Sequence, residues 1–126
     1  MEYKIVIPGK FPSLNEFISA NRVRKGSWSK GNEMKQKSQA SIIPYIKKAI
    51  KKPLGSIHLC YHFYEGSTRR DVDNVSSYFV KVFQDSLVKS GLLPDDNQKY
   101  IWAFEVVFHI DKENPRIEVE IIEIGV

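Results

Sequence analysis

Alternating hydrophobic and polar residues predict four β-strands in this chain. The strands are expected at residues 3–8, 56–64, 101–110 and 116–121, and residues 111–115 have the composition of a hairpin turn between the last two. Side chains on a strand alternate between its two faces. The second predicted strand therefore has an apolar face, formed by Ile57, Leu59, Tyr61 and Phe63, and a mixed face, formed by His58, Cys60, His62 and Tyr64.

The last two predicted strands alternate in the same way. In the first of them, the residues expected to share one face are Trp102, Phe104, Val106, Phe108 and Ile110, with Glu105 and His109 on the other. In the second, Ile117, Val119 and Ile121 are expected to point inward, and Arg116, Glu118 and Glu120 outward. The adjacent residues Ile121 and Ile122 break the alternation, which predicts a β-bulge or a slip in strand register there.

Hydrophobic residues at helical spacing predict two main helices, at about residues 32–51 and from Val75 to the natural stop at Gly91. Pro44 is expected to bend or split the first helix. Residues 11–16 are expected to form a loop. The order β, loop, α, β, α, β, β predicts an α+β fold in one domain over residues 1–126, with a single mixed sheet of about four strands packed against two main helices.

The composition excludes several classes of protein. The apolar runs are too short to span a membrane, and the first residues lack the pattern of a signal peptide. The single cysteine, Cys60, excludes an internal disulfide framework and is typical of a reducing compartment, so we expect a cytoplasmic protein. Without a glycine-rich phosphate loop, no nucleotide cofactor is expected.

Charge is distributed unevenly along the chain. The net charge is +4, but the first 70 residues carry 14 Lys and Arg against four Asp and Glu, whereas residues 71–126 carry five against 11. Such asymmetry indicates a polyanionic partner such as nucleic acid. A solvated basic helix face is the alternative interpretation.

Two short acidic clusters stand within this basic chain. Asp71 and Asp73 lie just before the second predicted helix, and Asp95 and Asp96 lie just after it. Converging carboxylates are the ligands by which proteins hold Mg²⁺ or Mn²⁺ against a phosphate. Each cluster could also have a purely structural role, because Asp73 could cap the helix and Asp95-Asp96 could form an Asx turn.

Three segments together resemble the RusA-type Holliday junction resolvases, a family of phage and prophage endonucleases in DNA recombination and repair. The segments are Ile7-Pro8-Gly9 leading to Pro12-Ser13-Leu14-Asn15-Glu16, then Arg70-Asp71-Val72-Asp73-Asn74, and finally Asp85-Ser86-Leu87 followed by Gly91-Leu92-Leu93-Pro94-Asp95-Asp96. Their order and content agree with the family over nearly the whole chain.

The resemblance implies roles for individual residues. Asp71, Asp73 and Asp96 match the family's catalytic carboxylates, which would hold Mg²⁺ or, as an alternative, Mn²⁺, with Asp95 beside them in the outer coordination sphere. Arg70 matches the basic residue before the first aspartate. Clustered carboxylates repel one another, so at least one should have a raised pKa without metal.

The family's catalytic lysine has no direct counterpart. Its position, one turn after the second aspartate, is occupied by Ser77. The stretch from Asp73 to Asp96 is also four residues longer than usual, and one extra helical turn accounts for both departures by moving the lysine role to Lys81. Four residues rotate a helix by about 40° past a full turn and advance it by about 6 Å, so Lys81 keeps roughly the same face.

The resemblance also implies the partners: a four-way DNA junction, and a second copy of the chain, since paired cuts in a two-fold symmetric junction require two sites related by a dyad. The candidate DNA-binding residues are Asn15, Arg22, Arg24, Lys25, Trp28, Lys30, Lys35, Lys37, Arg69 and Arg70. Basic residues of this kind bind phosphates without reading sequence. Trp28 would either stack on an exposed base or serve in packing.

Three alternatives stay open at this stage. His58, Cys60 and His62 are of zinc-ligand type, but alternate positions on one strand spread them over about 13 Å, too far for one ion without a bulge. The Ser77 departure would suit a branched-DNA-binding module that does not cut. The same acidic site would also serve a metal-dependent nuclease acting on forks, flaps or RNA.

Overall fold

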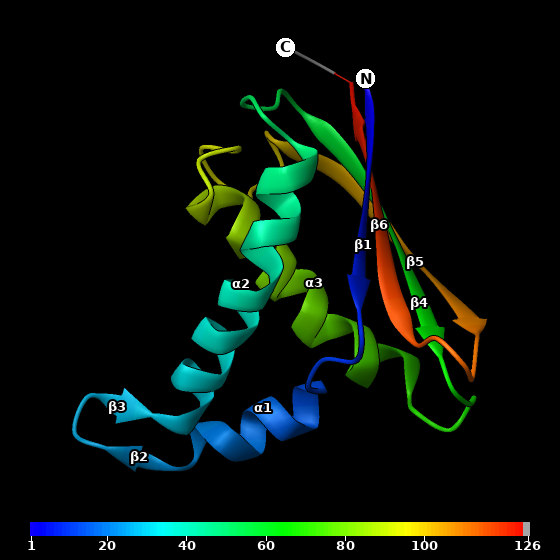
Figure 1. Ribbon diagram of the computed structural model, residues 1–126. Coiled ribbons are helices and arrows are strands. Elements are labelled where there is room, and N and C mark those ends of the chain that lie inside the picture. Colours follow the sequence, from blue (N-terminus) through cyan, green and yellow to red (C-terminus); the bar gives the residue numbers. More distant parts are fainter. Residues whose placement is uncertain (125–126) are drawn as a thin grey trace.

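The computed structural model describes residues 1–124, which form an α+β fold of three helices, a mixed four-stranded sheet and a small hairpin (Figure 1). The predicted fold class is confirmed. In chain order, the elements are β1 (Glu2–Pro8), α1 (Leu14–Asn21), β2 (Arg24–Lys25), β3 (Trp28–Ser29), α2 (Lys30–Ala49), β4 (Ile57–Glu65), α3 (Val72–Lys89), β5 (Ile101–Ile110) and β6 (Arg116–Glu123).

The main sheet has the strand order β1-β6-β4-β5. Strands β4 and β5 are parallel, and β6 is antiparallel to both β1 and β4. The predicted hairpin between β5 and β6 is therefore wrong, because β4 lies between them. Residues 111–115 instead cross the end of β4, where the amide of Asp111 donates to the carbonyl of Glu65 at 2.8 Å.

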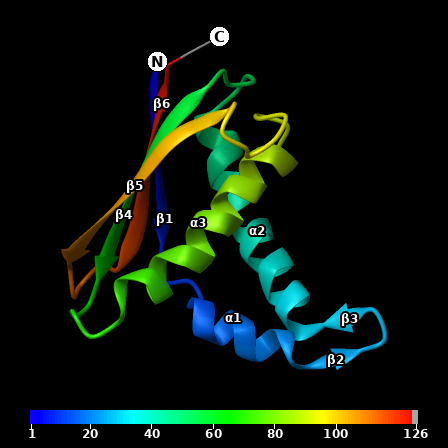
Figure 2. The ribbon, with the colours of Figure 1, turned by 180° about the vertical axis from the view of Figure 1, so that it is seen from behind.

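Helices α2 and α3 cover one face of the sheet and leave the other face open (Figures 1 and 2). The covered face of β4 is the predicted apolar one, and Ile57, Leu59, Tyr61 and Phe63 are all buried. The helices bury residues at the predicted helical spacing, and all of them belong to one hydrophobic core: Ile42 and Ile46 from α2, and Val75, Phe79, Val82, Phe83 and Leu87 from α3.

Two details of strand register differ from expectation. No bulge occurs at Ile121 and Ile122, because β6 pairs in unbroken register with both neighbours, and Ile122 lies on the open face with 37% of its surface exposed. The irregularity lies between β4 and β5, next to Ile57. It places Ile101 in the core and brings the exposed ring of Trp102 near His58. Phe104 and Phe108 instead contact Tyr61 and Phe63, so the prediction that Trp102 shares their face is wrong.

The loop predicted at residues 11–16 is wrong in its second half, because helix α1 begins at Leu14. Ser13 caps this helix, and the Glu16 side chain bonds back to the Ser13 amide, which completes a capping box. Helix α2 runs through Pro44 as one helix from residue 30 to residue 49. Pro44 and Ala40, whose carbonyl loses its usual partner, are not buried, so water can hydrate that carbonyl. None of the helices in residues 1–124 combines the length and apolar character needed to cross a membrane.

Gly91 ends α3 in a Schellman motif that directs the chain toward Asp95 and Asp96. It has φ of 78°, and the amides of Gly91 and Leu92 donate to the carbonyls of Val88 and Leu87 at 3.0 Å each. Leu92 is then buried beneath the turn. The backbone of Gly91 therefore positions the second acidic cluster relative to α3.

We predict that Gly91→Ala destabilises the protein by about 1–2 kcal/mol, because an L-residue is strained at this positive φ although its Cβ would meet no other atom. Thermal unfolding followed by circular dichroism should show a Tm lowered by several degrees. Gly66→Ala is the matched control, since Gly66 also has open space around it but no positive φ. Equal stability of the two variants would contradict the strain at Gly91.

Candidate active site

The start of α3 presents the first acidic cluster. Asp71 is the N-cap residue with extended backbone, but its side chain makes no capping hydrogen bond, and Asp73 lies within the first helical turn. Asp73 is therefore not the helix cap that a purely structural role required. Both residues are exposed. Among the described residues 1–124, neither carboxylate forms a side-chain hydrogen bond or ion pair, so both are available to a ligand.

These carboxylates line an open cleft between the N-termini of α1 and α3. The cleft has a volume of about 450 Å³ and is lined by Leu14, Asn15, Asp71, Val72, Asp73 and Asn74. The two helix starts are joined directly, because the Asn15 amide donates to Asn74 Oδ1 at 2.8 Å. Helix N-termini carry partial positive charge and exposed amides, which favour a phosphate. The cleft thus combines carboxylates for a cation with an environment suited to an anion.

Arg70 is anchored beside this cleft. One guanidinium nitrogen lies 3.3 Å from Glu65 Oε1, and another donates to the carbonyl of Phe11 at 3.5 Å. The Glu65 side chain is only 10% exposed. A buried carboxylate is costly unless it is paired, so Arg70 neutralises Glu65 as well as standing next to Asp71. Arg69 is exposed, and its side chain has no partner among residues 1–124.

The second acidic cluster meets α3 at Lys81. The Lys81 Nζ lies 2.9 Å from Asp96 Oδ2 and 3.2 Å from Asp85 Oδ1, and Lys35 binds the other Asp85 oxygen at 2.9 Å. Lys81, the lysine predicted from the sequence, therefore contacts Asp96. Asp85 was not predicted as a site residue, although residues four apart on a helix are neighbours and Asp85 lies four residues after Lys81.

This pairing sets the ionisation of Asp96. The hydrogen bond from Lys81 is the largest cause that lowers the pKa of the Asp96 carboxyl, and the same contact raises the pKa of Lys81. Asp96 is therefore not a carboxyl whose pKa is raised by repulsion from its neighbours, because the nearest charge is the Lys81 cation. The Asp95 carboxylate accepts from the Asp96 amide at 2.7 Å and from the Asn97 side chain at 3.2 Å, so it also shapes the turn.

The two acidic clusters remain separate in this arrangement. Within residues 1–124, no three of the four aspartates have ligand oxygens within 4.8 Å of one another. Asp71 and Asp73 share the cleft, whereas Asp96 is held by Lys81. Carboxylate oxygens are the donors that Mg²⁺ and Mn²⁺ prefer, so the pair in the cleft fits such an ion chemically.

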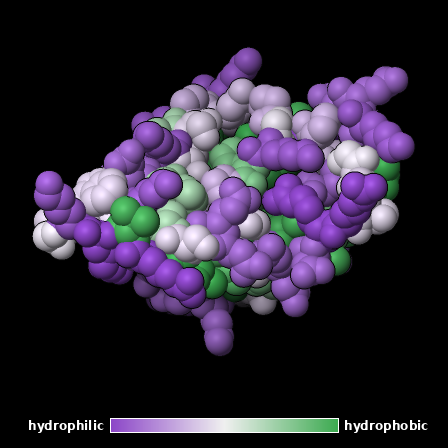
Figure 3. Space-filling view, turned by 90° about the horizontal axis from the view of Figure 1, so that it is seen from below, coloured by the Kyte–Doolittle hydropathy of each residue, from purple (hydrophilic) through white to green (hydrophobic). Residues whose placement is uncertain are grey.

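The basic segment forms a projecting hairpin. Strands β2 and β3 pair Arg24 with Ser29 and Lys25 with Trp28, and Gly26 at φ 61° makes the turn. Figure 3 looks at this end of the molecule, where hydrophilic side chains dominate and apolar ones form separate patches. Arg22, Arg24, Lys25 and Lys30 are exposed there.

The other predicted DNA-binding residues of this region bind acidic side chains of the same chain. Lys37 pairs with Glu33 at 3.1 Å, and Lys35 pairs with Asp85 as described above. The Trp28 side chain donates to the same Glu33 at 2.9 Å, and 44% of Trp28 is exposed. Stacking of Trp28 on a base stays a prediction.

The possible zinc ligands that lie together in the structure differ from the set suggested by the sequence. His58 lies by Trp102, whereas Cys60 and His62 come together with Glu120 of the neighbouring strand. Burial and the neighbouring Glu105 raise the pKa of the Cys60 thiol to about 11, so Cys60 is not a thiolate nucleophile at neutral pH.

Comparison with known families identifies the class of protein to which this fold belongs. The family model described as endodeoxyribonuclease RusA matches residues 17–122, which include both acidic clusters and Lys81. Because the match spans most of the chain, the protein belongs to the RusA family of endodeoxyribonucleases, and the resemblance is confirmed. Comparison with individual curated proteins found no match.

We predict that Lys81→Met raises the pKa of the Asp96 carboxyl, which NMR titration of the side-chain carboxyl would measure. In the unmodified protein this pKa lies below its ordinary value of 3.8, so the ion pair is complete above that pH and is lost as the pH falls through the lowered pKa. Lys99→Met removes a nearby exposed lysine and should leave the Asp96 pKa unchanged. An unchanged pKa in Lys81→Met would show that the pair does not form.

Proposed function

We propose that this protein is a Mg²⁺-dependent endodeoxyribonuclease that resolves four-way DNA junctions by paired symmetric cuts. The observation that carries the proposal is the pair of unengaged carboxylates, Asp71 and Asp73, in a cleft between two helix N-termini, in a chain of the RusA family. A protein that needed these acids only for capping would use the Asp71 side chain as a cap, and this one does not.

Asp71 and Asp73 would hold the ion, with Asp96 as the third ligand and Asp95 in the outer coordination sphere. A bound Mg²⁺ or Mn²⁺ would lower the pKa of a water and offset negative charge on the scissile phosphate. Because Asp96 is separate from Asp71 and Asp73, the proposal requires the turn at residues 94–97 to approach the start of α3 when the site is loaded.

Lys81 is proposed as the cation that replaces the family's lysine. Its side chain is 61% exposed and flexible, so it can exchange Asp96 for a phosphate oxygen. Arg70, anchored by Glu65, is proposed to stabilise charge that develops on the phosphate. The amides at the starts of α1 and α3 would contribute further donors to the same phosphate.

The β2–β3 hairpin is proposed as the surface that binds the DNA backbone. Its exposed cations can reach phosphates away from the cleft because the hairpin projects from the sheet and helices (Figure 1). Two-fold symmetric cutting would require two copies of the chain, and we propose a homodimer with an isologous interface.

One observation favours a second candidate, a branched-DNA-binding protein that does not cut. Ser77 stands where the family has its lysine, and its hydroxyl donates to the Asp73 carbonyl at 2.6 Å, so no cation lies one turn after Asp73. This candidate predicts junction binding in chelator and no cleavage with any metal. Cleavage of forks, flaps or RNA in preference to junctions would instead retain the enzyme and change its substrate.

We predict that Asp73→Asn lowers the cleavage rate of a synthetic four-way junction by about 100–1,000-fold, the typical effect of losing one preorganised electrostatic group. Single-turnover assays with Mg²⁺, with Mn²⁺ and with chelator would measure it. Glu113→Gln is the matched control, because Glu113 is exposed and lies in the crossover at residues 111–115. Cleavage by Asp73→Asn at the normal rate would contradict the proposal.

The hairpin assignment has its own test. We predict that the double variant Arg24→Gln, Lys25→Gln weakens junction binding and lowers the slope of log K against log salt by about one unit for each lost phosphate contact. Fluorescence anisotropy in chelator would measure binding without cleavage. Lys112→Gln, which removes an exposed lysine near the end of β4, should leave the slope unchanged. An unaltered slope in the double variant would exclude the hairpin from the DNA interface.

A further inference from the structure

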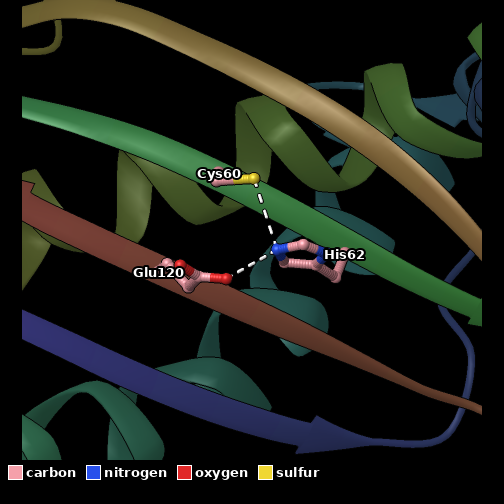
Figure 4. Close-up of side chains that lie close together, drawn as sticks. All are labelled: Cys60, His62 and Glu120. Carbon is pink, nitrogen blue, oxygen red and sulfur yellow. Dashed lines mark hydrogen bonds and ion pairs between the residues drawn. The ribbon is translucent and has the colours of Figure 1, made fainter.

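The open face of the sheet carries a cluster of side chains that the nuclease chemistry does not use. Cys60 and His62 come from β4 and Glu120 from β6, and Figure 4 shows all three side chains on the side of the sheet away from the helices. They alternate with core residues such as Tyr61 and Val119, which point toward the helices. The cluster and the acidic cleft therefore lie on different parts of the molecule.

The donor atoms of this cluster converge. His62 Nε2 lies 3.3 Å from Cys60 Sγ and 2.6 Å from Glu120 Oε1, and all three donor atoms lie within 4.8 Å of one another. This is the only such group of three His, Cys, Asp or Glu residues in the part of the chain that the structure describes. One ring nitrogen thus faces a sulfur and a carboxylate oxygen together.

Sheet register brings residues far apart in sequence together here. Cys60 lies directly opposite Glu120 on β6 and directly opposite Glu105 on β5. Opposite residues on paired strands have Cβ atoms about 4.5–5.5 Å apart, closer than alternate residues along one strand. A ligand set that crosses strands is therefore more compact than the set His58, Cys60 and His62 on one strand.

The second nitrogen of His62 is also engaged. His62 Nδ1 lies 2.9 Å from His109 Nε2 on β5, and the His109 ring stacks on Tyr64 with centroids 4.4 Å apart. A histidine that ligates a metal through one nitrogen is usually oriented by a hydrogen bond at the other. His109, itself held by the stack, supplies that contact and directs Nε2 toward Cys60 and Glu120.

We propose that Cys60 Sγ, His62 Nε2 and a Glu120 oxygen bind a borderline-soft divalent cation of the Zn²⁺ class. Thiolate, imidazole and carboxylate are the ligands that zinc uses, and Mg²⁺ disfavours the first two. Cys60 is a thiol in the metal-free protein, so the bound cation would displace its proton, which is released to solvent. Zinc–ligand bonds of about 2.0–2.3 Å place tetrahedral ligands about 3.3–3.8 Å apart. The sulfur–nitrogen separation fits this range, and the nitrogen–oxygen pair would open from its hydrogen-bonded distance.

The fourth position is open to water or to Glu105. The cluster is accessible, because Glu120 is 48% and His62 20% exposed at the side chain, and a hollow lined in part by Cys60 and Glu105 adjoins it. This inference does not rest on the proposed nuclease function, since its ligands, their chemistry and their face of the sheet are all different.

Cobalt spectroscopy tests the site directly on the chain of 126 residues. We predict that Co²⁺ added to metal-free protein produces a thiolate-to-cobalt charge-transfer band in the near ultraviolet, and that one equivalent of Zn²⁺ per chain abolishes it. Cys60→Ser and His62→Ala should lose the band, and His58→Ala, on the same face of the same strand but outside the cluster, should retain it. No band in the unmodified protein, or the same band in Cys60→Ser, would overturn the proposal.

Three further measurements distinguish this site from a lone thiol that binds metal and from the acidic cleft. His109→Ala should retain the band but lower the affinity for Co²⁺ by about 10–100-fold, as expected of a positioning residue. Asp71→Asn and Asp73→Asn should leave it unchanged, whatever their effect on cleavage. In the unmodified protein, Zn²⁺ should slow alkylation of Cys60, the single cysteine of the chain, so the test does not depend on the folding of a variant. Alkylation at an unchanged rate would count against the site.

Discussion

The packing of α3 on the centre of the sheet determines where the candidate active site and the open-face cluster lie. Phe79 of α3 meets Tyr61 and Phe63 of β4 in edge-to-face contacts, with ring centroids 6.1 and 5.7 Å apart, and Phe83 meets Tyr61 at 5.8 Å. All four rings are essentially fully buried. Such pairs contribute beyond the area that they bury and fix the rotation of the helix about its axis.

That rotation places both parts of the candidate active site. One face of α3 packs in the core, so its first turn exposes Asp73 beside the start of α1. Further along α3, Lys81 contacts Asp96, which lies in the segment that follows Gly91. Because one face of β4 also packs in the core, its alternate side chains lie on the open face of the sheet. The positions of Cys60 and His62 thus follow from the register that buries Tyr61.

Patterns local in sequence predicted much of this correctly. Helical spacing identified α3, alternation identified the buried face of β4, and the two acidic motifs together identified the family.

The Ser13 and Glu16 capping box was present in the sequence, but the short helix α1 has a single buried residue, Ala20, and therefore little hydrophobic periodicity from which to predict it. Strand order could not be predicted, because residues 111–115 have the composition of a hairpin turn whether or not β4 lies between β5 and β6. The Cys60, His62 and Glu120 cluster depends on that order, so spacing along one strand could not reveal it.

We propose that the cleft at the start of α3 belongs to an enzyme that cuts branched DNA with the help of a metal ion. The decisive measurement is to map the cut positions on a four-way junction labelled in turn on each strand. We expect paired nicks at symmetric positions on two opposing strands, present with Mg²⁺ and absent with chelator. Junction binding with no nick under Mg²⁺ or Mn²⁺ would contradict this proposal.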